Sequence, residues 1–167
     1  NLVRNQGVSL IAAWQLNEAI TLKSITAYRD GKTNTLIDFD SSPQPALDIP
    51  GRYEDDQTSQ EFQVMFEGER WQGVAGLYYL DASASGAFDT PIGALGLTIA
   101  TSGYVDTTSY AAFADVSYSI TDRWRVSLGG RYTEDEKEGS VLRQDYLGLG
   151  SPLFGNDAAV FFRTRTD

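Results

Sequence analysis

The sequence predicts an all-β protein, namely an antiparallel transmembrane β-barrel segment of six to seven strands with short periplasmic turns and long extracellular loops. Apolar and polar residues alternate with a period of two in successive segments, as in half-buried strands. Short turns alternate with loops of about 25 to 27 residues, a length that is uncommon inside compact soluble domains and typical of one side of an outer-membrane barrel. Tyr and Trp lie near the strand ends, where amphipathic rings meet a membrane–water interface.

The composition agrees with strands rather than membrane helices. The chain has 167 residues, of which 12% are aromatic, and its mean hydropathy is −0.29. No stretch approaches the roughly 20 consecutive apolar residues of a membrane-spanning helix. A barrel strand exposes only every second residue to lipid, so a low mean hydropathy is compatible with a membrane barrel.

The first two strands are expected at residues 7–16 and 19–29, joined by a short turn. In the second strand Leu22 and Ile25 fall on opposite parities, which predicts either a β-bulge or a blurred lipid face. Residues 30–56 contain three prolines and have no clear period, so they are expected to form a loop. Within this predicted loop, the preceding strand could extend for a short distance near Leu36.

The cleanest alternation lies in residues 57–67, and residues 71–80 return as the next strand. A second loop is expected at residues 82–106, which are rich in Gly, Ala and Ser. Residues 108–120 and 124–133 form another alternating pair, followed by a third loop at residues 134–159. A seventh strand is expected to begin at Val160 and to continue to Arg165.

Several functional classes are excluded by what the chain lacks. It contains no Cys and no His, so disulfides, thiolate zinc sites, cysteine nucleophiles and histidine bases are absent. Its formal net charge of −10 argues against nucleic acid as a partner. Carboxylates are numerous, yet no pair lies in a recognisable catalytic context, so we expect no enzyme, no cofactor and no metal site.

A set of polar residues lies on the strand parity that would face a barrel lumen. Contact with a passing ligand is one hypothesis for them. Cross-strand or plug-facing hydrogen bonds and ion pairs are the interpretation that we favour. Phe113 shares this parity and would suit packing against a plug. The candidate substrate-binding residues are Glu61, Gln63, Asp115, Arg125 and Arg131.

Acidic residues gather in the first expected loop and could supply oxygen ligands to Ca²⁺. Their spacing matches no calcium-loop pattern, so a solvated loop is the preferred interpretation. The acidic run at residues 134–138 is interpreted in the same way. The first group comprises Asp38, Asp40, Asp48, Glu54, Asp55 and Asp56.

Five segments, which lie between Leu10 and Lys137, resemble the barrel of TonB-dependent outer-membrane receptors. Their aromatic-rich hairpins are moderately specific for that family. The segments are Ser24–Arg29 (SITAYR), Gln57–Val64 (QTSQEFQV), Trp71–Tyr79 (WQGVAGLYY), Ser109–Trp124 (SYAAFADVSYSITDRW) and Val126–Thr133 (VSLGGRYT).

The resemblance implies a receptor of 22 strands whose lumen holds an N-terminal plug, and which takes up an iron chelate, vitamin or oligosaccharide with energy from the TonB complex. It also implies the outer membrane of a Gram-negative bacterium, with membrane lipid and a small nutrient as partners. Residues 1–167 would then be part of the barrel domain, about a quarter to a third of it, with no segment resembling a plug. An open sheet of this size would leave unpaired edges in lipid, so we expect the remainder of a barrel beside it.

Two alternatives belong to other classes. One is a soluble secreted β-sandwich that binds carbohydrate on exposed aromatics such as Trp71 and Trp124, with a core between two sheets. The other is a small structural outer-membrane barrel, which would need about eight strands to close. The long loops favour the receptor over the sandwich.

Overall fold

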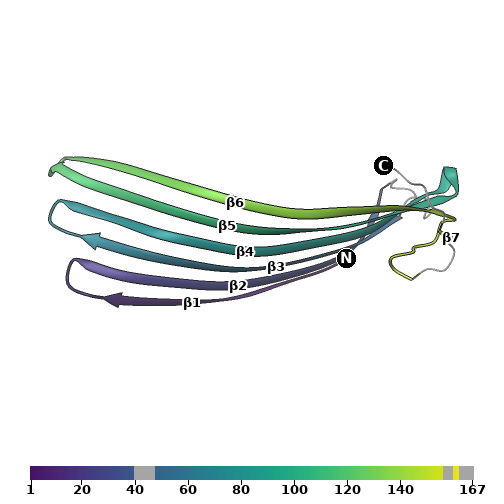
Figure 1. Cartoon of the computed structure of the whole chain (residues 1–167), viewed down its shortest axis with the longest axis horizontal. Helices are drawn as coiled ribbons and strands as arrows, with labels where there is room; N and C mark the ends of the chain where they lie inside the picture. Colours follow the sequence, from purple (N-terminus) through teal and green to yellow (C-terminus); the bar gives the residue numbers. More distant parts are fainter. Residues whose placement is uncertain (40–47, 156–159, 162–167) are drawn as a thin grey trace.

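The computed structural model describes residues 1–39, 48–155 and 160–161. Nearly all of them lie in one antiparallel sheet whose strand order follows the sequence, β1-β2-β3-β4-β5-β6-β7 (Figure 1). The strands are β1 (Leu2–Gln15), β2 (Ile20–Asp38), β3 (Asp48–Glu67), β4 (Trp71–Ile92), β5 (Leu97–Thr121), β6 (Trp124–Leu147) and β7 (Val160–Phe161). The predicted fold class, an antiparallel barrel-type sheet of six to seven strands, is confirmed.

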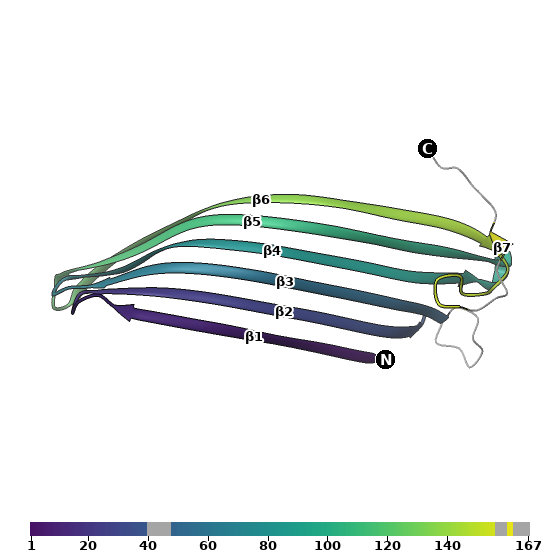
Figure 2. The ribbon, with the colours of Figure 1, turned by 60° about the horizontal axis from the view of Figure 1, so that its bottom comes forward.

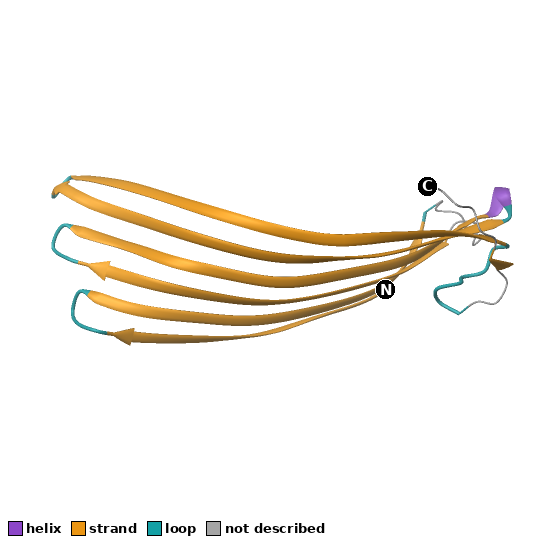
Figure 3. Cartoon of the chain, in the orientation of Figure 1, coloured by secondary structure: helices purple, strands orange, loops and turns teal. Residues whose placement is uncertain are grey.

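Helical structure in the described part of the chain is limited to the 3₁₀ turn η1 (Gly93–Leu95), which Figure 3 shows at the end of the β4–β5 hairpin. Gly96, with a φ of 61°, ends this turn in the left-handed region that glycine tolerates. None of the described segments is a helix of the length and apolarity needed to cross a bilayer.

Three tight turns join β1 to β2, β3 to β4 and β5 to β6, and all lie at one end of the sheet (Figure 1). The Asn17 side chain accepts hydrogen bonds from the amides of Ala19 and Ile20, each at 2.9 Å. In the third turn the Thr121 hydroxyl accepts a bond from the Trp124 amide at 3.1 Å. Short polar side chains therefore replace the backbone partners that a tight turn leaves unpaired.

The long strands correct the boundaries of the three expected loops. Residues 30–38 and 48–56 continue β2 and β3 in one uninterrupted register. Most of residues 82–106 belongs to β4 and β5, which are separated only by residues 93–96. Residues 134–147 continue β6. On this side of the sheet the chain forms long hairpins where loops were expected.

These extensions show no regular alternation of apolar and polar residues. A strand that is solvated on both faces is held by its backbone ladder and needs no apolar stripe. The register through Leu22 and Ile25 is also continuous, so the change of parity in β2 is a blurred face rather than a bulge. The irregularity that the structure does contain lies between Ser119 and Thr121, beside the third turn.

The sheet is a single curved layer, as the rotated view shows (Figure 2). Among the described residues, the buried apolar side chains are Ala100 and Ala111, so this layer has no core of its own. No second sheet covers it in the described part of the chain, and the β-sandwich alternative is therefore wrong. The seventh strand begins at Val160 as predicted, and residues 162–165 of that prediction lie outside the described residues.

Candidate functional site

The cross-strand register divides the side chains of the sheet between two unlike faces. Residues paired directly across neighbouring strands point to the same face of a sheet. One such row is Trp14, Leu22, Val64, Ala75, Ala114 and Gly130. We call this the outward face, because its apolar side chains are exposed: Trp14 is 67% and Val64 is 44% accessible.

Two aromatic belts bound the apolar part of the outward face. The belt near the tight turns contains Trp71 and Tyr118, whose ring centroids are 4.3 Å apart. The other belt contains Tyr79 and Tyr110, with centroids 5.1 Å apart. Trp71 and Tyr79 enclose about nine residues of β4, the length that a barrel strand needs to cross a bilayer. The structure thus has the features of one class of protein, a transmembrane β-barrel wall.

The opposite, inward face carries the candidate residues. Gln63 pairs with Gly76, Gly76 with Phe113, and Phe113 with Arg131, so these four residues form one cross-strand row on β3 to β6. Strands lie about 4.8 Å apart, which places Gln63 and Arg131 on a surface roughly 14 Å wide. The sequence predicted the common face, and the register adds that these residues share one cross-strand row.

Arg131 is held over two aromatic rings of this face. Its guanidinium carbon lies 5.4 Å from the ring centroid of Tyr78 and 5.9 Å from that of Phe113. Its Nε donates a hydrogen bond to the Thr133 hydroxyl at 3.0 Å. The planar cation remains exposed and keeps further donors for an acceptor in the lumen.

Phe113 rests on a glycine. A Cβ atom at Gly76 would overlap the Phe113 ring and would lie 2.7 Å from the backbone oxygen of Phe62. The absent side chain therefore lets the ring lie flat on β4 and present its free side to the lumen. Tyr78 is a residue of this cluster that the sequence analysis missed, since its alternation with Val74 and Leu80 resembles an apolar stripe.

Glu61 and Asp115 flank the row on either side. The Gln63 amide donates a hydrogen bond to the Glu61 carboxylate. Asp115 faces Gly129 in the register, and a Cβ atom at Gly129 would lie 2.5 Å from Asp115 Oδ2. Asp115 and Met65 also line a hollow of about 470 Å³ on this part of the sheet. Hydrogen-bonding and charged groups of both signs therefore converge on the same side of β3 to β6.

Arg125 is the candidate that the structure separates from the others. It pairs with Ser119 beside the third turn, and its Nε donates to the Ser119 hydroxyl at 3.4 Å. Six residues of strand, about 20 Å, lie between it and Arg131. Four of the five candidates thus lie on one patch of the inward face, and Arg125 lies at the tight-turn end of that face.

Ion pairs in the described residues lie away from this row. Lys32 Nζ and Arg52 Nε approach the Glu54 carboxylate at 3.4 and 3.6 Å on the β2 and β3 extensions. None of the five candidate residues takes part in a salt bridge with another described residue.

The acidic residues of the first expected loop do not form one group. Asp38 and Asp48 are paired across β2 and β3, whereas the acidic residues at 54–56 lie further along β3. Glu54, Asp55 and Asp56 are consecutive on β3, so Asp55 points to the face opposite to that of its two neighbours. Asp40 lies outside the described residues. Within the described ranges, no three acidic side chains are grouped closely enough to hold a metal ion.

Comparison with known proteins gives this barrel wall a family. The family model described as "TonB dependent receptor-like, beta-barrel" matches residues 1–159. The chain therefore belongs to the TonB-dependent receptor β-barrel family. This is a family of outer-membrane receptors and transporters of Gram-negative bacteria, and it is not a family of enzymes.

A solved structure shares the fold. The crystal structure of the ferric yersiniabactin uptake receptor FyuA from Yersinia pestis matches with a TM-score of 0.66 and 15% sequence identity. The match covers 86% of this chain and 25% of that receptor chain. The chain thus spans about a quarter of the length of the structure it resembles. A search of curated proteins gave no match.

Proposed function

We propose that residues 1–167 form part of the barrel domain of an outer-membrane receptor for TonB-dependent nutrient uptake. In this proposal the outward face contacts membrane lipid and the inward face lines the lumen. The observation that carries it is the two-faced sheet of a family member, with an apolar band about one bilayer tall between two aromatic belts. Under this proposal the partners are those of other family members, namely the rest of the barrel, a plug and the TonB complex.

The long hairpins are proposed to capture the ligand outside the membrane. On β4, about thirteen residues continue beyond Tyr79, which corresponds to roughly 40 Å along the strand. The corresponding extensions of β5 and β6 run beside that of β4, and their residues remain paired along the whole length. Such paired extensions can present side chains far from the bilayer without a flexible loop, which lowers the ordering cost of binding.

The inward row is proposed to contact the plug or a passing ligand. Arg131, supported by Tyr78 and Phe113, offers a planar cation at one end of the row. Gln63 at the other end, with Glu61 in the adjacent row, offers acceptors. A carboxylate on either partner would fit the guanidinium. Arg125 is proposed to act separately, near the periplasmic opening.

Uptake by cells that produce the full-length receptor tests the proposal. The probes are a radiolabelled ferric chelate, cobalamin and a labelled oligosaccharide, each offered with and without an uncoupler of the proton-motive force. We expect accumulation of one ligand class that the uncoupler abolishes, while surface binding of that ligand persists. Recovery of the receptor in the soluble fraction, or uptake that the uncoupler does not affect, would refute TonB-dependent transport.

A further inference from the structure

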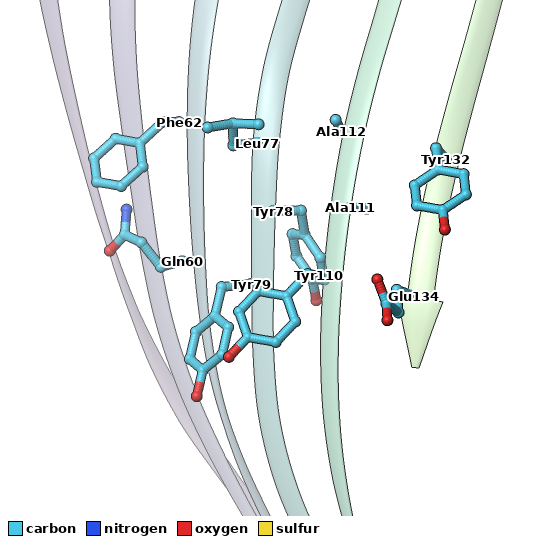
Figure 4. A pocket seen from close by; sticks show the side chains of 10 residues that line it. All are labelled: Gln60, Phe62, Leu77, Tyr78, Tyr79, Tyr110, Ala111, Ala112, Tyr132 and Glu134. Atoms are coloured by element: carbon cyan, nitrogen blue, oxygen red, sulfur yellow. The ribbon is translucent and has the colours of Figure 1, made fainter. Parts of the chain in front are cut away.

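A hollow of about 480 Å³ lies on the outward face of the long hairpins of β3 to β6. Tyr104 of β5 lines it, and it pairs with Ser85 of β4 on one side and with Ser140 of β6 on the other. Six residues of β5, about 20 Å, separate Tyr104 from Tyr110. Tyr110 and Tyr79, whose rings lie side by side in Figure 4, form the aromatic belt that ends the apolar band. The hollow is therefore well separated from that band.

Two apolar side chains line the hollow. The Tyr104 ring is 49% exposed, because the serines on both sides of it are too small to cover it. Leu142 of β6 is 55% exposed and lies in the adjacent row, where it pairs with Ser102. A pyranose sugar has an apolar face of C–H groups, which are attracted to the electron-rich face of an aromatic ring. Tyr104 and Leu142 therefore offer an apolar surface to one face of a sugar ring.

Hydroxyl groups surround these apolar side chains. Ser85 and Ser140 lie beside Tyr104, and Ser102 lies beside Leu142. Among the described residues, none is a hydrogen-bond partner of these three serine hydroxyls. Each hydroxyl can donate one hydrogen bond and accept others. The combination of an apolar surface with hydroxyl groups around it matches the face and the polar edge of a sugar ring.

The β3 wall of the hollow carries a carboxylate that is held in place by two cations. Lys32 Nζ and Arg52 Nε approach the same oxygen of Glu54, Oε1, at 3.4 and 3.6 Å. In the described part of the chain, Glu54 Oε2 has no partner and remains an acceptor. A carboxylate forms stronger hydrogen bonds with a hydroxyl donor than a neutral acceptor does. Glu54 can thus accept a bond from a hydroxyl at the edge of the sugar.

The charges around the hollow select against an acidic ligand. The neighbouring row toward the apolar band carries Asp56, Asp106 and Glu138 on β3, β5 and β6. It lies about 7 Å from the row of Glu54 and Tyr104. Its three carboxylates and that of Glu54 outnumber the two cations at Glu54. A phosphate, sulfate or uronate group would therefore be repelled here.

We propose that this hollow binds a pyranose unit of a glycan that carries no acidic group. The C–H face of the sugar packs on Tyr104 and Leu142, and its edge hydroxyls bond to the three serines and to Glu54. The inference goes beyond the proposed function, because the site lies on the outside of the hairpins rather than on the face that lines the lumen. Binding at this site requires no transport.

The chain offers a matched control for each of two substitutions. Tyr104→Ala removes the ring, and Tyr28→Ala removes a 44% exposed tyrosine of the same outward face that lies outside the hollow. Ser102→Phe fills the hollow. Thr108→Phe adds the same ring six residues further along β5 on the same face. Each variant is first tested for folding by the heat-dependent gel mobility of the full-length receptor.

The test is a calorimetric titration of the full-length receptor in lauryldimethylamine oxide, a detergent without a sugar headgroup. The probes are neutral tetrasaccharides of glucose, galactose and mannose, tetragalacturonate, and the neutral oligosaccharide that mild acid releases from the surface of the producing cells. We expect at least one neutral probe to bind, and Tyr104→Ala to weaken it about tenfold, the upper end of what one aromatic contact supplies. Ser102→Phe should abolish this binding, and Tyr28→Ala and Thr108→Phe should leave it unchanged.

The probes also identify the source of the glycan. Binding of a supplied tetrasaccharide supports a site for foreign glycans, and binding of the released oligosaccharide alone supports a site for the surface glycan of the same cell. Absence of binding by every neutral probe overturns the proposal. Binding that survives both Tyr104→Ala and Ser102→Phe places the sugar elsewhere on the receptor and also overturns it. Tetragalacturonate that binds as tightly as the best neutral probe would refute the selection against acidic ligands.

Discussion

A charge placed at the centre of the outward face should destabilise the receptor far more than the same charge placed on the extension of the same strand. Leu128 is the middle residue between Trp124 and Tyr132 and is 80% exposed. Exposure of that extent would make Leu128→Arg nearly neutral in a water-soluble protein. At the midplane of a bilayer, an arginine on the lipid face costs about 2 to 4 kcal/mol.

Leu142 provides the control, since it lies on β6 on the same outward face and is 55% exposed. It follows Tyr132 by ten residues, about 33 Å along the strand, and therefore lies beyond the membrane. We expect Leu142→Arg to change the free energy of unfolding by less than about 0.5 kcal/mol. The two variants should therefore differ by about 1.5 to 4 kcal/mol, which is roughly 10- to 900-fold in the folding equilibrium.

The assay is equilibrium urea unfolding of the full-length receptor in phospholipid vesicles, followed by tryptophan fluorescence and gel mobility. The free energies of unfolding of the two arginine variants are compared with that of the unaltered receptor. Equal costs for Leu128→Arg and Leu142→Arg, within about 0.5 kcal/mol, would refute the argument that the aromatic belts enclose a lipid-facing band.

Three further predictions concern the inward face and the outer end of the sheet. Gly76→Ala should cost about 1 to 3 kcal/mol in the same unfolding assay, because its Cβ would overlap the Phe113 ring. Combining it with Phe113→Ala should relieve part of that cost. Gly130→Ala is the control and should be neutral, because the space around its Cβ is open. Arg131→Gln should weaken ligand or plug binding in a titration of the receptor by about tenfold or more, as expected for a lost hydrogen bond to a charged group, and an unchanged affinity would remove it from the site. Asp89 is fully buried and accepts hydrogen bonds from the Ser151 hydroxyl and the Leu153 amide at 2.7 and 3.0 Å, so Asp89→Ala should speed proteolytic cleavage within residues 148–155, whereas Asp89→Asn, which keeps an acceptor, should not.

The membrane-crossing part of each strand could be predicted from the sequence because lipid imposes a strict alternation on it. Residues 62–66 and 124–132 are examples in which outward, mostly apolar side chains alternate with inward ones, and the period is therefore visible. The tight turns could be predicted as well, because short polar segments interrupt the alternation between consecutive strands. The order of the strands followed from those turns.

The extensions could not be predicted in the same way. Residues 82–92 are rich in Ala, Ser and Gly and pair with β5 through backbone hydrogen bonds alone, so nothing in their side chains distinguishes a strand from a loop. The packing of Asp89 against residues 148–155 joins segments about sixty residues apart, which no local pattern contains. The cross-strand row that Gln63 and Arg131 share likewise depends on the register of three strand pairs.

The central claim is that one short band of this sheet lies in a bilayer with its apolar face outward, while the strands continue into water beyond it. A nitroxide scan along β6 of the full-length receptor in vesicles tests this most directly, since oxygen and a water-soluble nickel chelate report lipid and water at each position. Between residues 125 and 132 we predict oxygen accessibility that alternates with a period of two and is highest at Val126, Leu128 and Tyr132. From Glu134 to Leu142 the outward positions should be accessible to the nickel chelate. Oxygen accessibility without alternation in the first range, or an unchanged lipid signal at Leu142, would contradict the account.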